Sequence, residues 1–298
     1  MSSAPAEHPP ANSAPAEHPP TSQAPTVGLL DSGLGLVPFA VAVHHELPHA
    51  NLALAMDPDF APYGALTSAQ IEQRALASAR TLVDVGARAL VIACNTASVH
   101  ALSAVRDQFE PDIPVIGTVP AVKPAAATGA PFAVWATTAT TGSAYQRSLI
   151  SMYAGDINAY PVACAGLAQA IDSADPETID IALSAAVTAT PREAQSIVLG
   201  CTHYGLVADR IESAFDRPVT LFDSPPAVAR QLARRLAVQV VSEDPAEVVP
   251  PPSSPPLSDR SAGRLTHVFL SGRPGHLPPA VEAYGVGREL LALRKTSE

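Results

Sequence analysis

Lysine and cysteine are scarce in this chain of 298 residues. Only two lysines occur, Lys123 and Lys295, and 28 acidic residues outnumber 18 basic ones, for a net charge of −10. A protein that binds nucleic acid through a basic face is therefore not expected. Three cysteines, an odd and small number, do not make a disulfide framework. We therefore expect a reducing, cytoplasmic compartment.

Long apolar runs are also lacking. No run approaches the roughly 20 residues that a membrane-spanning helix needs. The N-terminus has neither the basic nor the apolar region of a secretory signal. We therefore expect no membrane partner. A pyridoxal-phosphate enzyme is disfavoured too, because neither Lys123 nor Lys295 accompanies a phosphate-binding glycine loop.

Proline, in contrast, is abundant and unevenly spread. Residues 1–26 hold seven of the 31 prolines and contain a direct repeat, in which residues 3–10 recur as residues 13–20. Residues 244–263 hold six more. Neither segment has enough large apolar residues to bury a core. We expect a disordered tail at 1–26 and a Pro-rich insertion at 244–263.

Short apolar runs alternate with helical segments through the rest of the chain. Because the runs are apolar throughout, they resemble parallel strands that are covered on both faces. Thr67 and Gln70 form a capping box that predicts a helix ending at Gly86, and a second helix is expected over residues 227–241. The pattern predicts an α/β fold of two doubly wound parallel sheets. The runs are Val27–Leu30, Leu52–Met56, Ala89–Ala93, Val115–Ile116, Phe132–Trp135, Ile197–Leu199, Val219–Phe222 and Val268–Leu270.

Two segments repeat the same order of residue types. Residues 89–96 (ALVIACNT) and 196–203 (SIVLGCTH) each give a strand, a small residue, a cysteine and polar residues. A weaker pair, LLDSG at 29–33 and LFDSP at 221–225, places Asp31 and Asp223 after strands. The repetition indicates two similar halves. Ligands of open α/β sheets bind beyond the carboxyl ends of the strands, where both cysteines are expected.

The paired cysteines suggest acid/base chemistry. A helix N-terminus stabilises a thiolate, and helices are expected to follow Cys94 and Cys201, with Thr96 and Thr202 as N-caps. Two thiols on opposite sides of one ligand could invert a carbon centre, one removing a proton while the other donates one. This chemistry needs no cofactor.

A plainer interpretation of each cysteine is a small buried apolar residue, which we prefer for Cys164. A metal site through Cys201 and His203 would need further ligands, and the sequence offers no cluster of them. We therefore expect neither a metal nor a cofactor. His44, His45, His49 and His100 fit solvated positions on helix surfaces or ends, and His8 and His18 fit exposed positions in the N-terminal tail.

Four motifs occur in order along the chain: Asp31–Gly33, Pro62–Gly64, Ala93–Ser98 and Gly200–Tyr204. Together, at these separations, they make the sequence resemble the glutamate racemases of the aspartate/glutamate racemase superfamily. The resemblance covers residues 27–243 and 266–289. It implies a cofactor-independent isomerase that interconverts L- and D-glutamate and supplies D-glutamate for peptidoglycan. It implies glutamate as the small-molecule partner and allows a homodimer.

The resemblance also implies a role for each matching residue. Cys94 and Cys201 would be the acid/base thiols, with Asp31 and His203 assisting them. Asp172 would lie near the second thiol, and Thr137 and Thr140 near the substrate carboxylates. For these last three, helix capping is an equal alternative. The residues expected to contact substrate are Asp31, Ser32, Tyr63, Gly64, Asn95, Thr96, Thr202 and His203.

The family fold implies that the C-terminal part returns to the first half. We expect residues 27–118 plus 226–298 in one domain and residues 119–225 in the other, with the active site in a cleft that closes over glutamate. The sequence departs from the family pattern at Leu36, at residues 59–61 and at Ala165, which affects loop shape and affinity more than reaction type. The alternatives are an isomerase of another small acid, or a binding protein such as a modulator of DNA gyrase.

Overall fold

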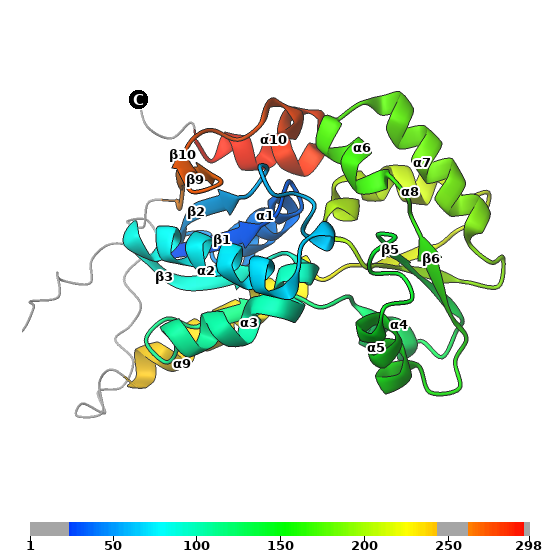
Figure 1. Cartoon of the computed structure of the whole chain (residues 1–298), viewed down its shortest axis with the longest axis horizontal. Coiled ribbons are helices and arrows are strands. Elements are labelled where there is room, and N and C mark those ends of the chain that lie inside the picture. Colours follow the sequence, from blue (N-terminus) through cyan, green and yellow to red (C-terminus); the bar gives the residue numbers. More distant parts are fainter. Residues whose placement is uncertain (1–23, 243–261, 295–298) are drawn as a thin grey trace, which may run out of the picture.

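The structure, a computed structural model, describes residues 24–242 and 262–294 and forms two sheets (Figure 1). The first has the strand order β10-β9-β2-β1-β3-β4 and the second β6-β5-β7-β8. In Figure 1 the first sheet lies to the left, and β5 and β6 of the second lie to the right. The expected α/β fold with two parallel-sheet units is confirmed. Most of the expected Pro-rich tail and insertion lies outside the described residues.

Parallel pairing holds the first sheet together, and only β10 runs antiparallel to its neighbour. Alternate strand residues face opposite layers. Leu29 packs in the core that contains α1 (Leu36–Glu46) and α9 (Pro225–Ser242), while Leu30 packs toward α2 (Ser68–Asp84) and α3 (Asn95–Phe109). Both faces are therefore covered, which explains the unbroken apolar runs. The strands are β1 (Thr26–Asp31), β2 (Asn51–Met56), β3 (Ala87–Ile92), β4 (Val115–Gly117), β9 (Leu265–Leu270) and β10 (Arg273–Pro274).

The second sheet is parallel throughout and also has helices on both faces. Phe132 packs in the cluster with α4 (Val122–Ala126) and α5 (Ala144–Ala154), whereas Trp135 belongs to the opposite core. That core includes α6 (Leu167–Ser173), α7 (Pro176–Ala189) and α8 (Ala208–Ala214). The strands are β5 (Phe132–Ala136), β6 (Ala159–Ala163), β7 (Ser196–Leu199) and β8 (Thr220–Phe222).

Two strands were not predicted. The strand β6 lies at a sheet edge, is partly exposed and contains Pro161, so it lacks the apolar signature of a buried strand. The strand β10 has only two residues. The predicted capping box is confirmed: Gln70 donates its main-chain N–H to the Thr67 hydroxyl, and α2 is followed by Gly86 at φ +90°.

The chain returns to the first sheet at its C-terminal end. After the residues outside the description, β9 pairs parallel with β2, and the segment continues through η4 (Pro279–Ala283) and α10 (Gly285–Ala292). Gly263, which the sequence predicts as part of the Pro-rich insertion, donates its main-chain N–H to the Pro48 carbonyl and packs against Ala50. Among the described residues, no helix is long and apolar enough to span a membrane.

Candidate active site

A cavity of about 280 Å³ lies where strand ends of both sheets meet. Cys94 comes two residues after β3 and Cys201 two residues after β7, and both side chains line this cavity. Within the part of the chain that the structure describes, no lysine or arginine lines it. The expected residues that also line it are Ser32, Tyr63, Gly64, Asn95, Thr96, Thr137, Thr140, Thr202 and His203.

Both thiols occupy helix N-cap positions. Cys94 is the N-cap of α3, and Cys201 is the N-cap of the short 3-10 helix η2 (Thr202–Val207). The predicted N-caps Thr96 and Thr202 are therefore wrong, because each helix begins earlier than its apolar pattern indicates. At Cys94, the main-chain N–H of Ala97 in the first turn of α3 donates to the sulfur.

The environment of Cys94 differs from the one we expected. Burial raises the pKa of the Cys94 thiol to about 12, and the negative charge of Asp31 acts in the same direction. Hydrogen bonds from the main chain of Ala97 and from Ser32 oppose the rise without cancelling it. The expected lowering of the pKa by the helix N-terminus is thus outweighed by burial. Cys94 is a thiol at neutral pH in this structure.

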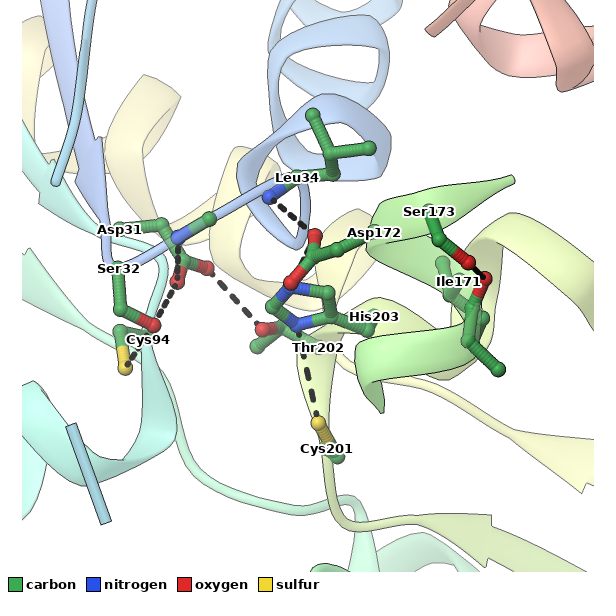
Figure 2. Close-up of polar contacts among 12 residues, drawn as sticks. Asp31, Ser32, Leu34, Cys94, Ile171, Asp172, Ser173, Cys201, Thr202 and His203 are labelled. Carbon is green, nitrogen blue, oxygen red and sulfur yellow. Dashed lines mark hydrogen bonds and ion pairs between the residues drawn. The ribbon is translucent and has the colours of Figure 1, made fainter. Parts of the chain in front are cut away.

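Asp31 lies behind the cavity lining and joins its two sides. Its buried carboxylate accepts hydrogen bonds from the Ser32 hydroxyl (3.2 Å), the Gly33 main chain (3.3 Å) and the Thr202 hydroxyl (3.0 Å). Burial raises the pKa of Asp31, although the charge of His203 and these hydrogen bonds act to lower it. The Ser32 hydroxyl also lies 3.9 Å from the Cys94 sulfur. Asp31 therefore connects the surroundings of Cys94 to η2 (Figure 2).

A chain of contacts leads away from Cys201. The Cys201 sulfur lies 3.8 Å from Nδ1 of His203, whose Nε2 lies 3.1 Å from the Asp172 carboxylate. Figure 2 shows this line of side chains beside the Asp31 group. Burial alone would lower the pKa of His203, but its hydrogen bonds to Asp172 and Cys201 raise it well above the usual value. A protonated imidazole thus stands next to Cys201.

Asn95 links the two halves of the site. Its Nδ2 donates a hydrogen bond of 3.0 Å to the main-chain carbonyl of Gly200, the residue before the second thiol. Its Oδ1 is buried and has no hydrogen-bond partner. An acceptor that is buried without a partner is costly, so this oxygen is available to a donor in the cavity.

The threonine pair lies on the second-sheet side. The Thr137 hydroxyl donates to the Thr140 hydroxyl at 3.1 Å, and both side chains line the cavity. Neither threonine is the N-cap of α5, because that position belongs to Ser143, and their contact with substrate stays a prediction. Tyr63 lies in η1 (Tyr63–Ala65), and its hydroxyl donates to the buried Asp57 carboxylate at 2.8 Å.

Cys164 and Gln169 are among the cavity-lining residues that were not predicted as site residues. Cys164 is buried as predicted, but it also lines the cavity, and burial raises the pKa of its thiol to about 12. Gln169 contributes to the lining from α6. Recognition of β6 as a strand would have placed Cys164 at a carboxyl end. No three metal-ligating side chains cluster anywhere in residues 24–242 and 262–294.

The departures from the family pattern have local explanations. Leu36 is the first residue of α1 and is fully buried in the core. Asp59 forms an ion pair with Arg273 at 2.8 Å, and the Arg74 guanidinium lies 4.0 Å from the centre of the Phe60 ring. Ala165 is exposed. None of these residues lines the cavity between the thiols.

The fold and the paired thiols define an amino-acid racemase of the two-domain α/β type. Residues 40–232 match the Asp/Glu/Hydantoin racemase family. This match spans more than half of the chain. The chain therefore belongs to that family.

Individual relatives narrow the assignment. The chain is 37% identical over 215 residues to a glutamate racemase from Methylococcus capsulatus, covering 70% of this chain and 79% of the relative. It is 34% identical over 216 residues to one from Stutzerimonas stutzeri, covering 71% and 81%. The Escherichia coli glutamate racemase, solved with L-glutamate and the activator UDP-MurNAc-Ala, superimposes with a TM-score of 0.68 at 26% identity, covering 87% of this chain and 92% of that one. These similarities place the chain in the glutamate racemase branch of its family.

Proposed function

We infer that this chain racemizes glutamate and so supplies D-glutamate for peptidoglycan synthesis. The observation that carries the inference is the pair of N-cap thiols, Cys94 and Cys201, on one cavity. Family membership supports the substrate, because the relatives are named glutamate racemases and one was solved with L-glutamate.

The proposed reaction consists of two proton transfers. One sulfur, as thiolate, removes the α-proton and becomes a thiol, while the C–H bond electrons stay on the α-carbon. The other thiol donates its proton to the opposite face of that carbon and becomes a thiolate. When the two sulfurs exchange roles, the opposite enantiomer of glutamate is converted. No electrons are exchanged with a cofactor.

Each thiol has a different proton-handling environment. The raised pKa of Cys94 keeps it protonated, so it is ready to donate. Cys201 lies next to the protonated His203, whose charge balances a thiolate formed there, and Asp172 holds the imidazole on its far side. Asp31 completes the arrangement by holding Ser32 and Thr202.

Substrate contacts are proposed for the neutral polar lining. Oδ1 of Asn95 can accept a hydrogen bond from the α-ammonium group of the substrate, because this oxygen has no donor in the structure. Hydroxyl groups can bind the two carboxylates of glutamate because they donate hydrogen bonds. In this proposal Ser32, Thr96 and Thr202 hold the α-carboxylate region, Thr137 and Thr140 hold the side-chain carboxylate, and Tyr63 and Gly64 lie against the substrate.

We further propose the division into residues 27–118 plus 226–298 and residues 119–225. The strand membership of the two sheets supports it, because each sheet takes all its strands from one set. The cleft between the sets would close on glutamate and exclude water. Location in the cytoplasm is proposed from the three free cysteines, which persist best under reducing conditions. A homodimer stays a prediction.

The deciding experiment follows optical rotation of L-glutamate with the purified full chain and no added cofactor. The wild-type chain should bring the rotation to zero. Cys94→Ala and Cys201→Ala should each abolish this, since each removes one proton-transfer partner. Racemization at near-normal rate by either variant would contradict the two-thiol mechanism. Loss of rotation only after addition of pyridoxal phosphate would contradict the cofactor-independent reaction.

A further inference from the structure

Asp172 is carried by the short helix α6, whose apolar residues Leu167 and Ile171 are buried in the core. The helix α6 has only seven residues and is flanked by two left-handed residues, Gly166 at φ +74° and Ala174 at φ +53°. The Asp172 side chain is 38% exposed, so burial does not fix it. A helix this short depends on tertiary contacts for its position. The contacts at the C-terminal end of α6 therefore determine where Asp172 lies.

Tyr284 supplies such a contact from the C-terminal segment. It lies between η4 and α10, is 5% exposed, and donates its hydroxyl proton to the main-chain carbonyl of Ile171. Figure 1 shows α10 next to α6. The carbonyl also accepts from the Ala174 main chain at 3.0 Å. The last carbonyls of a helix lack full intrahelical bonding, and the phenol meets this need.

The contact lies one residue from Asp172. Burial, with the charge of Asp172 as a second cause, raises the pKa of Tyr284 to about 12, so the phenol remains a donor at neutral pH. Asp172 in turn accepts from the Leu34 main chain at 3.4 Å and lies 3.1 Å from His203. The contacts thus run continuously from Tyr284 through Ile171 and Asp172 to His203 and the Cys201 sulfur.

We propose that Tyr284 is a positioning residue for proton transfer at Cys201, acting through the end of α6 on Asp172 and His203. The inference rests on the proposed racemization of glutamate by two thiols. The contacts reach the Cys201 sulfur through His203, whereas the route to Cys94 is longer and continues through Thr202, Asp31 and Ser32. The influence of Tyr284 is therefore expected to be larger on proton transfer at Cys201 than on proton transfer at Cys94.

This asymmetry can be measured with α-deuterated glutamate. In Tyr284→Phe, proton removal by Cys201 becomes slower, so the deuterium isotope effect rises for the enantiomer whose α-hydrogen goes to Cys201. For the mirror form, Cys201 donates a proton derived from solvent, so the isotope effect of the substrate deuteron falls. We expect kcat to fall about tenfold, as for one lost hydrogen bond. Tyr153→Phe, on the partly exposed end of α5, is the matched control and should match the wild type.

A double-mutant cycle identifies the route of the effect. In an Asp172→Asn background, Tyr284→Phe should cause little further loss, because the path through Asp172 is already weakened. Isotope effects that change equally for both enantiomers, additive losses in the cycle, or a Tyr284→Phe variant that behaves like the wild type would each overturn the proposal. If Tyr284→Phe does not fold, Tyr284→Leu, which also removes the hydroxyl donor, is measured in its place. A wild-type chain without racemase activity would instead contradict the proposed function.

Discussion

The hydroxyl of Tyr63 donates a 2.8 Å hydrogen bond to the carboxylate of Asp57, which follows β2 and is fully buried. Arg74 donates two hydrogen bonds to the same carboxylate, from Nε at 2.7 Å and from Nη2 at 2.8 Å. Burial alone would raise the pKa of Asp57, but the hydrogen bonds from Arg74, Ser271 and Tyr63 lower it. A wall of the cavity is thereby fixed to the first sheet and to α2.

Loss of Asp57 should destabilise the protein strongly. Asp57→Ala leaves the partly buried Arg74 guanidinium without its partner, and we expect the free energy of unfolding to fall by about 3 kcal/mol. The matched control is Asp59→Ala, which breaks an exposed ion pair with Arg273 and should cost less than about 1 kcal/mol. Urea denaturation of both variants measures the difference. Equal losses would show that the buried cluster does not stabilise the fold.

The pH dependence of stability should reveal Asp223. Burial raises the pKa of Asp223 to about 6, although a hydrogen bond from the Ser224 main chain opposes it. A raised pKa means that the contribution to stability is complete below the unfolded value of about 3.9 and is lost as the pH rises through about 6. Asp223→Asn should therefore melt higher than the wild type at pH 8, with the advantage vanishing near pH 4. Asp216→Asn, at an exposed ion pair, should show no such trend.

A methyl group at Gly35 should disturb the active site directly. A Cβ atom there would lie 2.1 Å from the Thr202 hydroxyl and 2.8 Å from the Asp31 carboxylate. The Asp31–Thr202 hydrogen bond must then break or shift. Because small misplacements of catalytic groups are costly, we expect kcat to fall by about 100-fold in Gly35→Ala. Steady-state kinetics, with melting curves to verify folding, measure this. A normal kcat would mean that Thr202 is free to move without consequence.

Closure of the cleft should depend on ligand. The Thr118 hydroxyl donates to the Ser224 hydroxyl at 3.0 Å, and both residues are buried where the chain passes between the two proposed domains. Saturating D-glutamate should slow hydrogen exchange around Thr118 and Pro225, because the closed cleft restricts local opening. Unchanged exchange in both segments would contradict the hinge, although the two-thiol chemistry could still operate in a rigid cleft.

The sequence predicted those parts of the molecule whose signals are local. The buried strands β1 and β3 are apolar along their length, and the capping box at Thr67 is a contact between near neighbours. The edge strand β6 was missed because Pro161 and its partly exposed neighbours break the apolar pattern, and the place of Cys164 on the cavity was missed with it.

The features that the sequence did not predict depend on tertiary contacts. Asp57 and Arg74 are 17 residues apart, and Tyr284 and Ile171 are 113 apart, so no local pattern marks either pair. The pKa of Cys94 likewise depends on contacts that form only in the folded chain. A helix start in the sequence predicts a lowered value, but burial and the charge of Asp31, both products of the folded chain, decide the outcome.

The hydroxyl groups that line the cavity affect which enantiomers of glutamate the site can hold. The hydroxyls of Thr96, Thr137 and Thr140 can each turn about a single bond and direct a proton to a new place without movement of the backbone. A rigid arginine fork would suit one arrangement of carboxylates better than its mirror image. The lining can therefore accommodate either hand of glutamate, so that neither enantiomer is trapped as product and the mixture can run on to equal amounts of both.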